Sequence, residues 1–115
     1  MTRLVALVGP LTGERHVVQT ASHPIDPAKM LPVADVVLIA SDVTGAAMMF
    51  RYTAHGDFAG DTLHETVGDA KIAAEAEYEE ALLPWEDVPD DVTDAHAFAV
   101  RYAYERLNDR GGGYD

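Results

Sequence analysis

The chain has 115 residues, of which 48% are apolar, and it contains no cysteine. This length suits one domain with one core, and the absence of cysteine excludes disulfides, thiolate catalysis and zinc–thiolate sites. The net charge is −12, and a field of that sign repels phosphate backbones, which argues against a nucleic-acid role.

The apolar runs near the N-terminus are short. Only five apolar residues, 4–8, precede Gly9-Pro10, whereas a signal peptide needs a longer apolar region and a membrane helix needs about 18 apolar residues. We therefore expect a soluble cytoplasmic protein that has no membrane segment.

Four segments of the first half predict strands. Residues 3–8 and 35–41 are short apolar runs rich in β-branched residues, while residues 14–20 and 46–53 each follow a turn that contains glycine. Residues 61–64 predict a further short extended piece, after a turn that we expect to use Gly56 and Gly60.

The second half predicts two helices, at about 66–82 and 91–108. Thr66 and Asp69 have the spacing of a capping box, and Asp90 or Asp91 is expected to cap the second helix. Apolar residues recur at helical spacing in both segments. They are Val67, Ala70, Ala74, Tyr78 and Ala81 in the first, and Val92, Ala95, Phe98, Ala99, Tyr102 and Ala103 in the second.

Strands followed by helices predict an α+β fold. We expect a mostly antiparallel sheet of about four strands with both helices packed on one face. Residues 1–110 are predicted to form a single domain. Residues 111–115, which begin with three glycines, are predicted to form a disordered tail.

The acidic excess is concentrated in one third of the chain. Residues 61–94 contain twelve acidic residues and one lysine, a net charge of −11, whereas residues 1–60 hold five acidic and four basic residues. Such a region attracts a basic protein partner, and it is also typical of a solvated face that aids solubility. The residues that we predict to bind a partner are Glu75, Glu79, Trp85, Glu86 and Asp87. Trp85 is also interpreted as a side chain that closes the edge of the core.

Polar side chains crowd the turn at residues 55–65. His55, Asp61 and His64 are the candidate catalytic residues, because imidazole and carboxylate groups transfer protons. Their spacing fits neither a zinc motif nor a calcium loop, and such residues are common in turns. We therefore predict no metal and no cofactor.

Residues 56–80, followed by Trp85 and Val88-Pro89, resemble a group of small bacterial proteins to which no activity is assigned. In that group a strand ends in Gly-Asp-Thr-Trp-His, a threonine-capped helix follows, and a Trp and a Val-Pro close the unit. The present chain has Leu63 at the aromatic position. The resemblance covers about a third of the chain and implies a local structure but no activity.

Three functional hypotheses follow from the sequence. The first is a non-enzymatic binding module that uses the acidic surface of residues 61–94. The second is a small metal-dependent or acid–base enzyme with its site at the turn 55–65. The third is a homodimer that forms through an exposed sheet edge.

Overall fold

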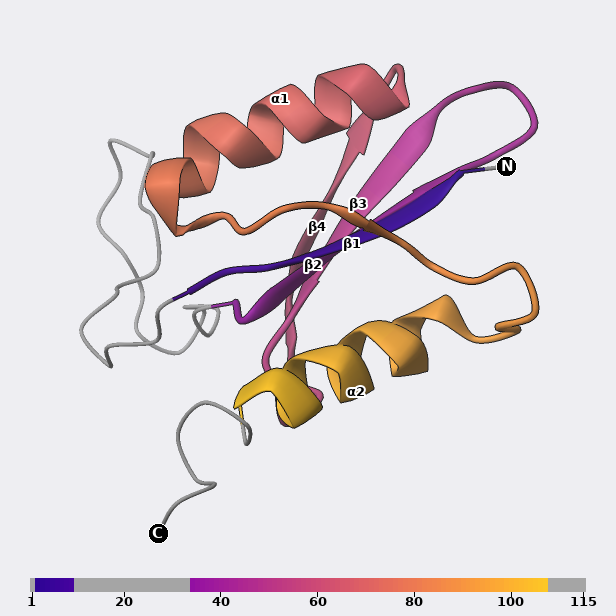
Figure 1. Ribbon diagram of the computed structural model, residues 1–115. Helices are drawn as coiled ribbons and strands as arrows, with labels where there is room; N and C mark the ends of the chain where they lie inside the picture. Colours follow the sequence, from indigo (N-terminus) through magenta and orange to yellow (C-terminus); the bar gives the residue numbers. More distant parts are fainter. Residues whose placement is uncertain (1, 10–33, 108–115) are drawn as a thin grey trace, which may run out of the picture.

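Five antiparallel strands form one sheet between two helices in the computed structural model, which describes residues 2–9 and 34–107 (Figure 1). The strands are β1 (Arg3–Leu7), β2 (Val36–Ser41), β3 (Ala47–Tyr52), β4 (Phe58–His64) and β5 (Glu86–Asp87), in the order β4-β3-β2-β1-β5. The helices are α1 (Val67–Tyr78), the short 3-10 helix η2 (Glu79–Ala81) and α2 (Ala95–Leu107). The predicted α+β class is confirmed.

The two helices lie on opposite faces of the sheet, so the prediction that both pack on one face is wrong (Figure 1). Val37 and Ile39 of β2 pack with α1, whereas Val36 and Leu38 pack with α2. All four residues are buried. A strand that is apolar at consecutive positions needs cover on both sides, because successive side chains point to opposite faces.

The helices cover different parts of the sheet. α1 contacts β2, β3 and β4, whereas α2 contacts β1 and β2. The side of β4 that faces away from α1 therefore has no helix over it in the described part of the chain. Phe58 and Leu63, which lie on that side because they pair with Tyr52 and Met48, are 48% and 69% exposed.

Three of the predicted strands correspond to β1, β2 and β3, whereas the one at 14–20 lies outside the described residues, as does the predicted tail at 111–115. β4 is longer than expected and β5 was not expected, which gives five strands instead of about four. β5 forms because the segment after η2 runs beside β1: Leu83 N–H donates to the Leu7 carbonyl, and Val88 N–H donates to that of Arg3.

The turn before β4 is shorter than predicted. It spans residues 53–57, where the Thr53 hydroxyl accepts from the Asp57 backbone N–H at 3.0 Å. Gly60 belongs to β4, at the position where the pairing with β3 shifts register between Phe50 and Tyr52. Its φ is 111°, which glycine adopts readily because it has no Cβ. Residues 58–60, expected as part of the turn, thus join the expected extended piece at 61–64 in an edge strand with a bulge.

The N-terminal caps agree with the sequence in one helix and differ in the other. The Thr66 hydroxyl accepts from the Asp69 N–H at 3.0 Å, which confirms the predicted cap of α1. In α2 the cap is Asp94, whose carboxylate accepts from the Ala97 N–H at 3.1 Å, and not Asp90 or Asp91. The chain still turns after Pro89, since the Val92 N–H donates to the Pro89 carbonyl.

No helix in the described part of the chain is both long enough and apolar enough to cross a membrane.

Candidate functional site

The three catalytic candidates do not converge. His55 lies in the turn between β3 and β4, while Asp61 and His64 lie on β4. Asp61 pairs with Phe50 and His64 with Ala47, and these two β3 residues face opposite sides of the sheet. Since Asp61 and His64 are three positions apart in a regular strand, their side chains point to opposite faces. No site that uses all three residues exists in this arrangement.

His64 instead joins a polar cluster under α1, formed by Arg51, Thr62, His64 and Glu77. The Arg51 guanidinium donates to both Glu77 carboxylate oxygens, at 3.2 Å from Nε and 2.7 Å from Nη2, and more weakly to the Thr62 hydroxyl at 3.5 Å. The Thr62 hydroxyl lies 2.7 Å from His64 Nε2. The cluster ties α1 to β3 and β4 across the sheet face.

The charges of this cluster neutralise each other. Burial alone would lower the pKa of Arg51, but the hydrogen bond and negative charge of Glu77 outweigh it, and the pKa is raised. Burial, followed by the charge of Glu77, raises the pKa of the neighbouring Tyr78 far above its usual range. Both oxygens of the Glu77 carboxylate accept hydrogen bonds from the guanidinium, and this bidentate pair holds α1 on β3.

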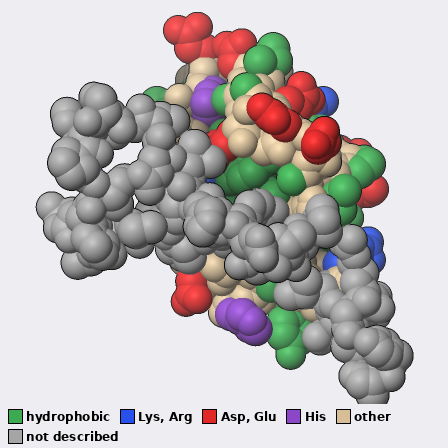
Figure 2. Space-filling model, turned by 90° about the vertical axis from the view of Figure 1, so that its left-hand side faces the viewer, with side chains coloured by type: hydrophobic (Ala, Val, Ile, Leu, Met, Phe, Trp, Pro, Cys, Tyr) green, Lys and Arg blue, Asp and Glu red, His purple; other side chains and the backbone are tan. Residues whose placement is uncertain are grey.

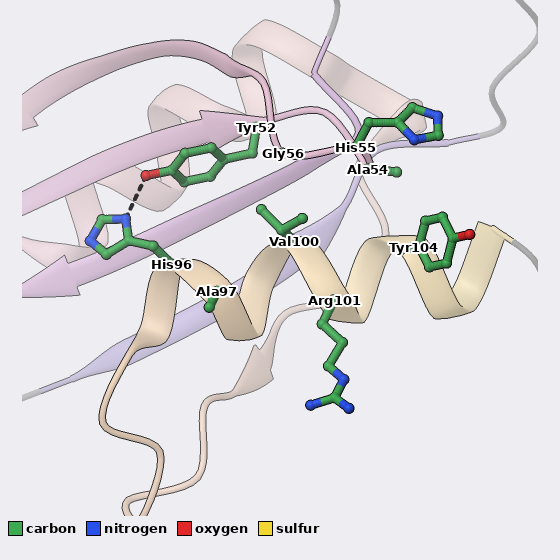
Figure 3. Close-up of a pocket in the computed structure, with 9 residues that line it drawn as sticks. All are labelled: Tyr52, Ala54, His55, Gly56, His96, Ala97, Val100, Arg101 and Tyr104. Carbon is green, nitrogen blue, oxygen red and sulfur yellow. Dashed lines mark hydrogen bonds between the residues drawn. The ribbon is translucent and has the colours of Figure 1, made fainter.

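A groove runs between α2 and the turn that joins β3 to β4 (Figure 3). Its volume is about 560 Å³, which falls in the size range of small-molecule sites. The nine lining residues are Tyr52, Ala54, His55, Gly56, His96, Ala97, Val100, Arg101 and Tyr104. One of the sequence candidates, His55, therefore lines this groove.

An aromatic group closes one end of the groove. The Tyr52 hydroxyl lies 2.5 Å from His96 Nδ1, and the His96 ring contacts the Phe50 ring edge-on with centroids 4.5 Å apart. Burial, and then the charges of Asp94 and Asp61, raise the pKa of Tyr52. Tyr52 thus keeps its proton at neutral pH and can donate it to Nδ1. The imidazole is held in one orientation by this bond and by the aromatic contact.

At the other end, His55 and Tyr104 face each other, with ring centroids 6.1 Å apart (Figure 3). Val100 points into the space between the two ends, and Arg101 points away from the strands (Figure 3). The Arg101 Nε lies 3.4 Å from a Glu105 oxygen, and both side chains are exposed. The guanidinium is therefore part of the outer rim.

Most of the residues that line this groove were not predicted from the sequence. His96, Val100 and Tyr104 are spaced four residues apart, which places them on one side of a helix. That spacing could have identified the side of the groove that α2 forms. No sequence signal indicated that the β3–β4 turn would lie opposite this side of α2.

The predicted partner-binding acids are at the surface. Glu75, Glu79, Glu86 and Asp87 are exposed, on α1, η2 and β5. Acidic side chains gather over α1 in the upper part of Figure 2. Of the twelve acids in residues 61–94, only Glu77 is not exposed. We call Glu75, Glu79, Glu86 and Asp87 the acidic surface.

Trp85 lies beside this surface but is half-buried and packs against the core on the α1 side. Its buried indole Nε1 has no hydrogen-bond acceptor among the described residues. The side chain therefore fills the edge of the core, which is one of its two roles considered from the sequence.

Within residues 2–9 and 34–107, no three His, Asp or Glu side chains are grouped so that they could hold a metal ion. Comparison of the chain with protein-family models, with curated proteins and with solved structures finds no match. The resemblance to the small bacterial group consequently stays a prediction.

Proposed function

We propose that this protein is a non-enzymatic binding module whose acidic surface docks a basic protein. The observation that carries the proposal is the separation of charge over the described residues. Eleven exposed carboxylates lie within residues 61–94, and Lys71 is the one basic residue in that stretch. Uncompensated charge of this kind accelerates the encounter with a partner of opposite sign.

Two of the other basic residues that the structure describes are engaged in internal contacts. Arg51 is buried against Glu77. Arg3 donates to the backbone carbonyls of Val92 and Pro89, at 2.7 and 2.8 Å. Because these guanidinium groups bind within the fold, they are poorly placed to neutralise the exposed carboxylates. The acidic surface therefore keeps its field for an external partner.

A charge-reversal comparison tests this proposal. The double variant Glu75→Lys/Glu86→Lys changes the acidic surface, and the control Asp57→Lys/Glu105→Lys changes two exposed acids outside residues 61–94 by the same charge. A basic protein captured from lysate at low salt should be lost with the first variant, retained with the control, and released at high salt. If both variants lose the partner to the same extent, net charge alone, and not this surface, attracts the partner.

A second candidate function is self-association through β4, because this seven-residue strand is the edge of the sheet and carries the exposed Phe58 and Leu63. Exposed edge strands pair readily with another chain. Light scattering tests it by comparing the molar mass in solution of Leu63→Lys with that of wild type. Val43→Lys, at a 90% exposed position in the β2–β3 turn, is the control. A monomeric wild type at high concentration would exclude this candidate.

A further inference from the structure

We propose that the groove between α2 and the β3–β4 turn is a second binding site, for a small flat aromatic molecule that is neutral or positively charged. The site is separate from the acidic surface, since none of the residues that line the groove belongs to that surface. The groove lies on the α2 side of the sheet, opposite α1 (Figure 1). It therefore does not depend on the function proposed above.

The shape of the groove fits a flat molecule. His96 and Tyr104 lie eight residues apart on α2, which corresponds to a length of about 12 Å. Ala54, Gly56 and Ala97 contribute little side-chain volume between these ends. Rings stand at both ends, and the lining between them is mostly apolar (Figure 3). Small residues between aromatic ends leave room for one or two fused rings.

The orientation of the rings favours an aromatic ligand. The His96 ring meets Tyr52 edge-on, with an angle of 89° between the ring planes and centroids 5.7 Å apart. The Tyr104 and His55 rings are likewise inclined by 68°. Inclined rings at both ends offer faces and edges to a third ring, which is the geometry that aromatic groups prefer. The bond from Tyr52 also fixes the orientation of the His96 ring at this end of the groove.

The electrostatics of the groove select the charge of the ligand. The carboxylates of Asp94 and Asp61 act on Tyr52 at one end, and the whole chain carries −12. Arg101 points outward and pairs with Glu105, so it offers little compensation inside (Figure 3). An anionic ligand would be repelled, whereas a cation is attracted by this field and by the ring faces.

Three probes that share one ring system test the proposal: tryptamine, indole and indole-3-acetate, which are positive, neutral and negative at pH 7. Titration calorimetry and NMR of the full chain should show saturable binding of tryptamine and indole, with shifts of the His55 and His96 signals. Indole-3-acetate should bind at least tenfold more weakly than tryptamine.

Two variants locate the site. Val100→Trp fills the space into which Val100 points and should abolish the binding of indole, whereas Ala76→Trp, at an exposed position on α1, should leave it unchanged (Figure 3). Tyr104→Ala removes a half-exposed ring and should weaken the binding of indole at least tenfold, which provides a test even where Val100→Trp fails to fold. The proposal is overturned by the absence of saturable binding, by unchanged binding to Tyr104→Ala, or by preference for indole-3-acetate.

Discussion

Replacement of Glu79 by glycine should stabilise the protein, because the backbone of this residue adopts a conformation that side chains disfavour. Glu79 ends α1 with φ 53° and ψ −127°, and it is the one residue other than glycine with a positive φ in the described part of the chain. This conformation is essentially reserved for glycine, and holding another residue there costs roughly 1–3 kcal/mol.

The magnitude follows from two opposing effects. Glycine relieves the strain of the folded state, but it also gives the unfolded chain more freedom, which costs about 0.5–1 kcal/mol. The net gain in the free energy of unfolding is therefore about 1 kcal/mol. For a domain of this size it raises the melting temperature by about 3–6 °C.

Thermal and urea denaturation of Glu79→Gly measure this gain directly. Glu80→Gly is the matched control, since Glu80 is also an exposed glutamate of η2 but has no positive φ. It should lose about 0.5–1 kcal/mol. Glu79→Ala, which removes the charge but keeps the Cβ, should change stability little. If Glu79→Gly is destabilised as much as Glu80→Gly, the strain assigned to this position is absent.

The other predictions concern the α1 side of the sheet. Arg51→Met should destabilise the fold by about 3–5 kcal/mol, because it leaves the Glu77 carboxylate unpaired, and the double variant Arg51→Met/Glu77→Met should recover most of that loss in denaturation experiments. Tyr78 has a raised pKa, so its contribution to stability is complete below the ordinary tyrosine pKa of 10.0 and falls as the pH rises above it. The melting temperature of Tyr78→Phe should consequently depend less on pH above 10 than that of wild type, and equal slopes would contradict the raised pKa. Thr66→Ala removes the cap of α1 and should cost about 1 kcal/mol, whereas Thr93→Ala, at an exposed position before α2, should cost less.

Much of the local structure was predictable because it depends on neighbours in sequence. The cap at Thr66 needs only the backbone N–H three residues later. The apolar stripes of both helices proved to be their buried sides, since Ala70 and Ala74 pack on one face of the sheet, and Ala99 and Ala103 on the other. Helical spacing brings such residues together wherever the helix docks.

The candidate site was less predictable, because it depends on contacts between distant segments. His55 was identified from the sequence, but its neighbour Tyr104 lies 49 positions later on α2. Tyr52 and His96, which meet at the other end of the groove, are separated by 44 positions. Nothing in the local pattern of either segment specifies this meeting.

The sequence by itself determined which residues of each helix turn inward, where α1 begins, and that the acidic residues after position 60 mostly face water. These features follow from the periodicity of one segment and from the cost of removing a charge from solvent. The tertiary structure alone decided on which face of the sheet each helix packs. An amphipathic helix buries its stripe equally well against either apolar face, and β2 offers two such faces in Val36–Ile39. The choice between them, and the groove that results beside α2, arises from how the described helices together cover both faces of the sheet.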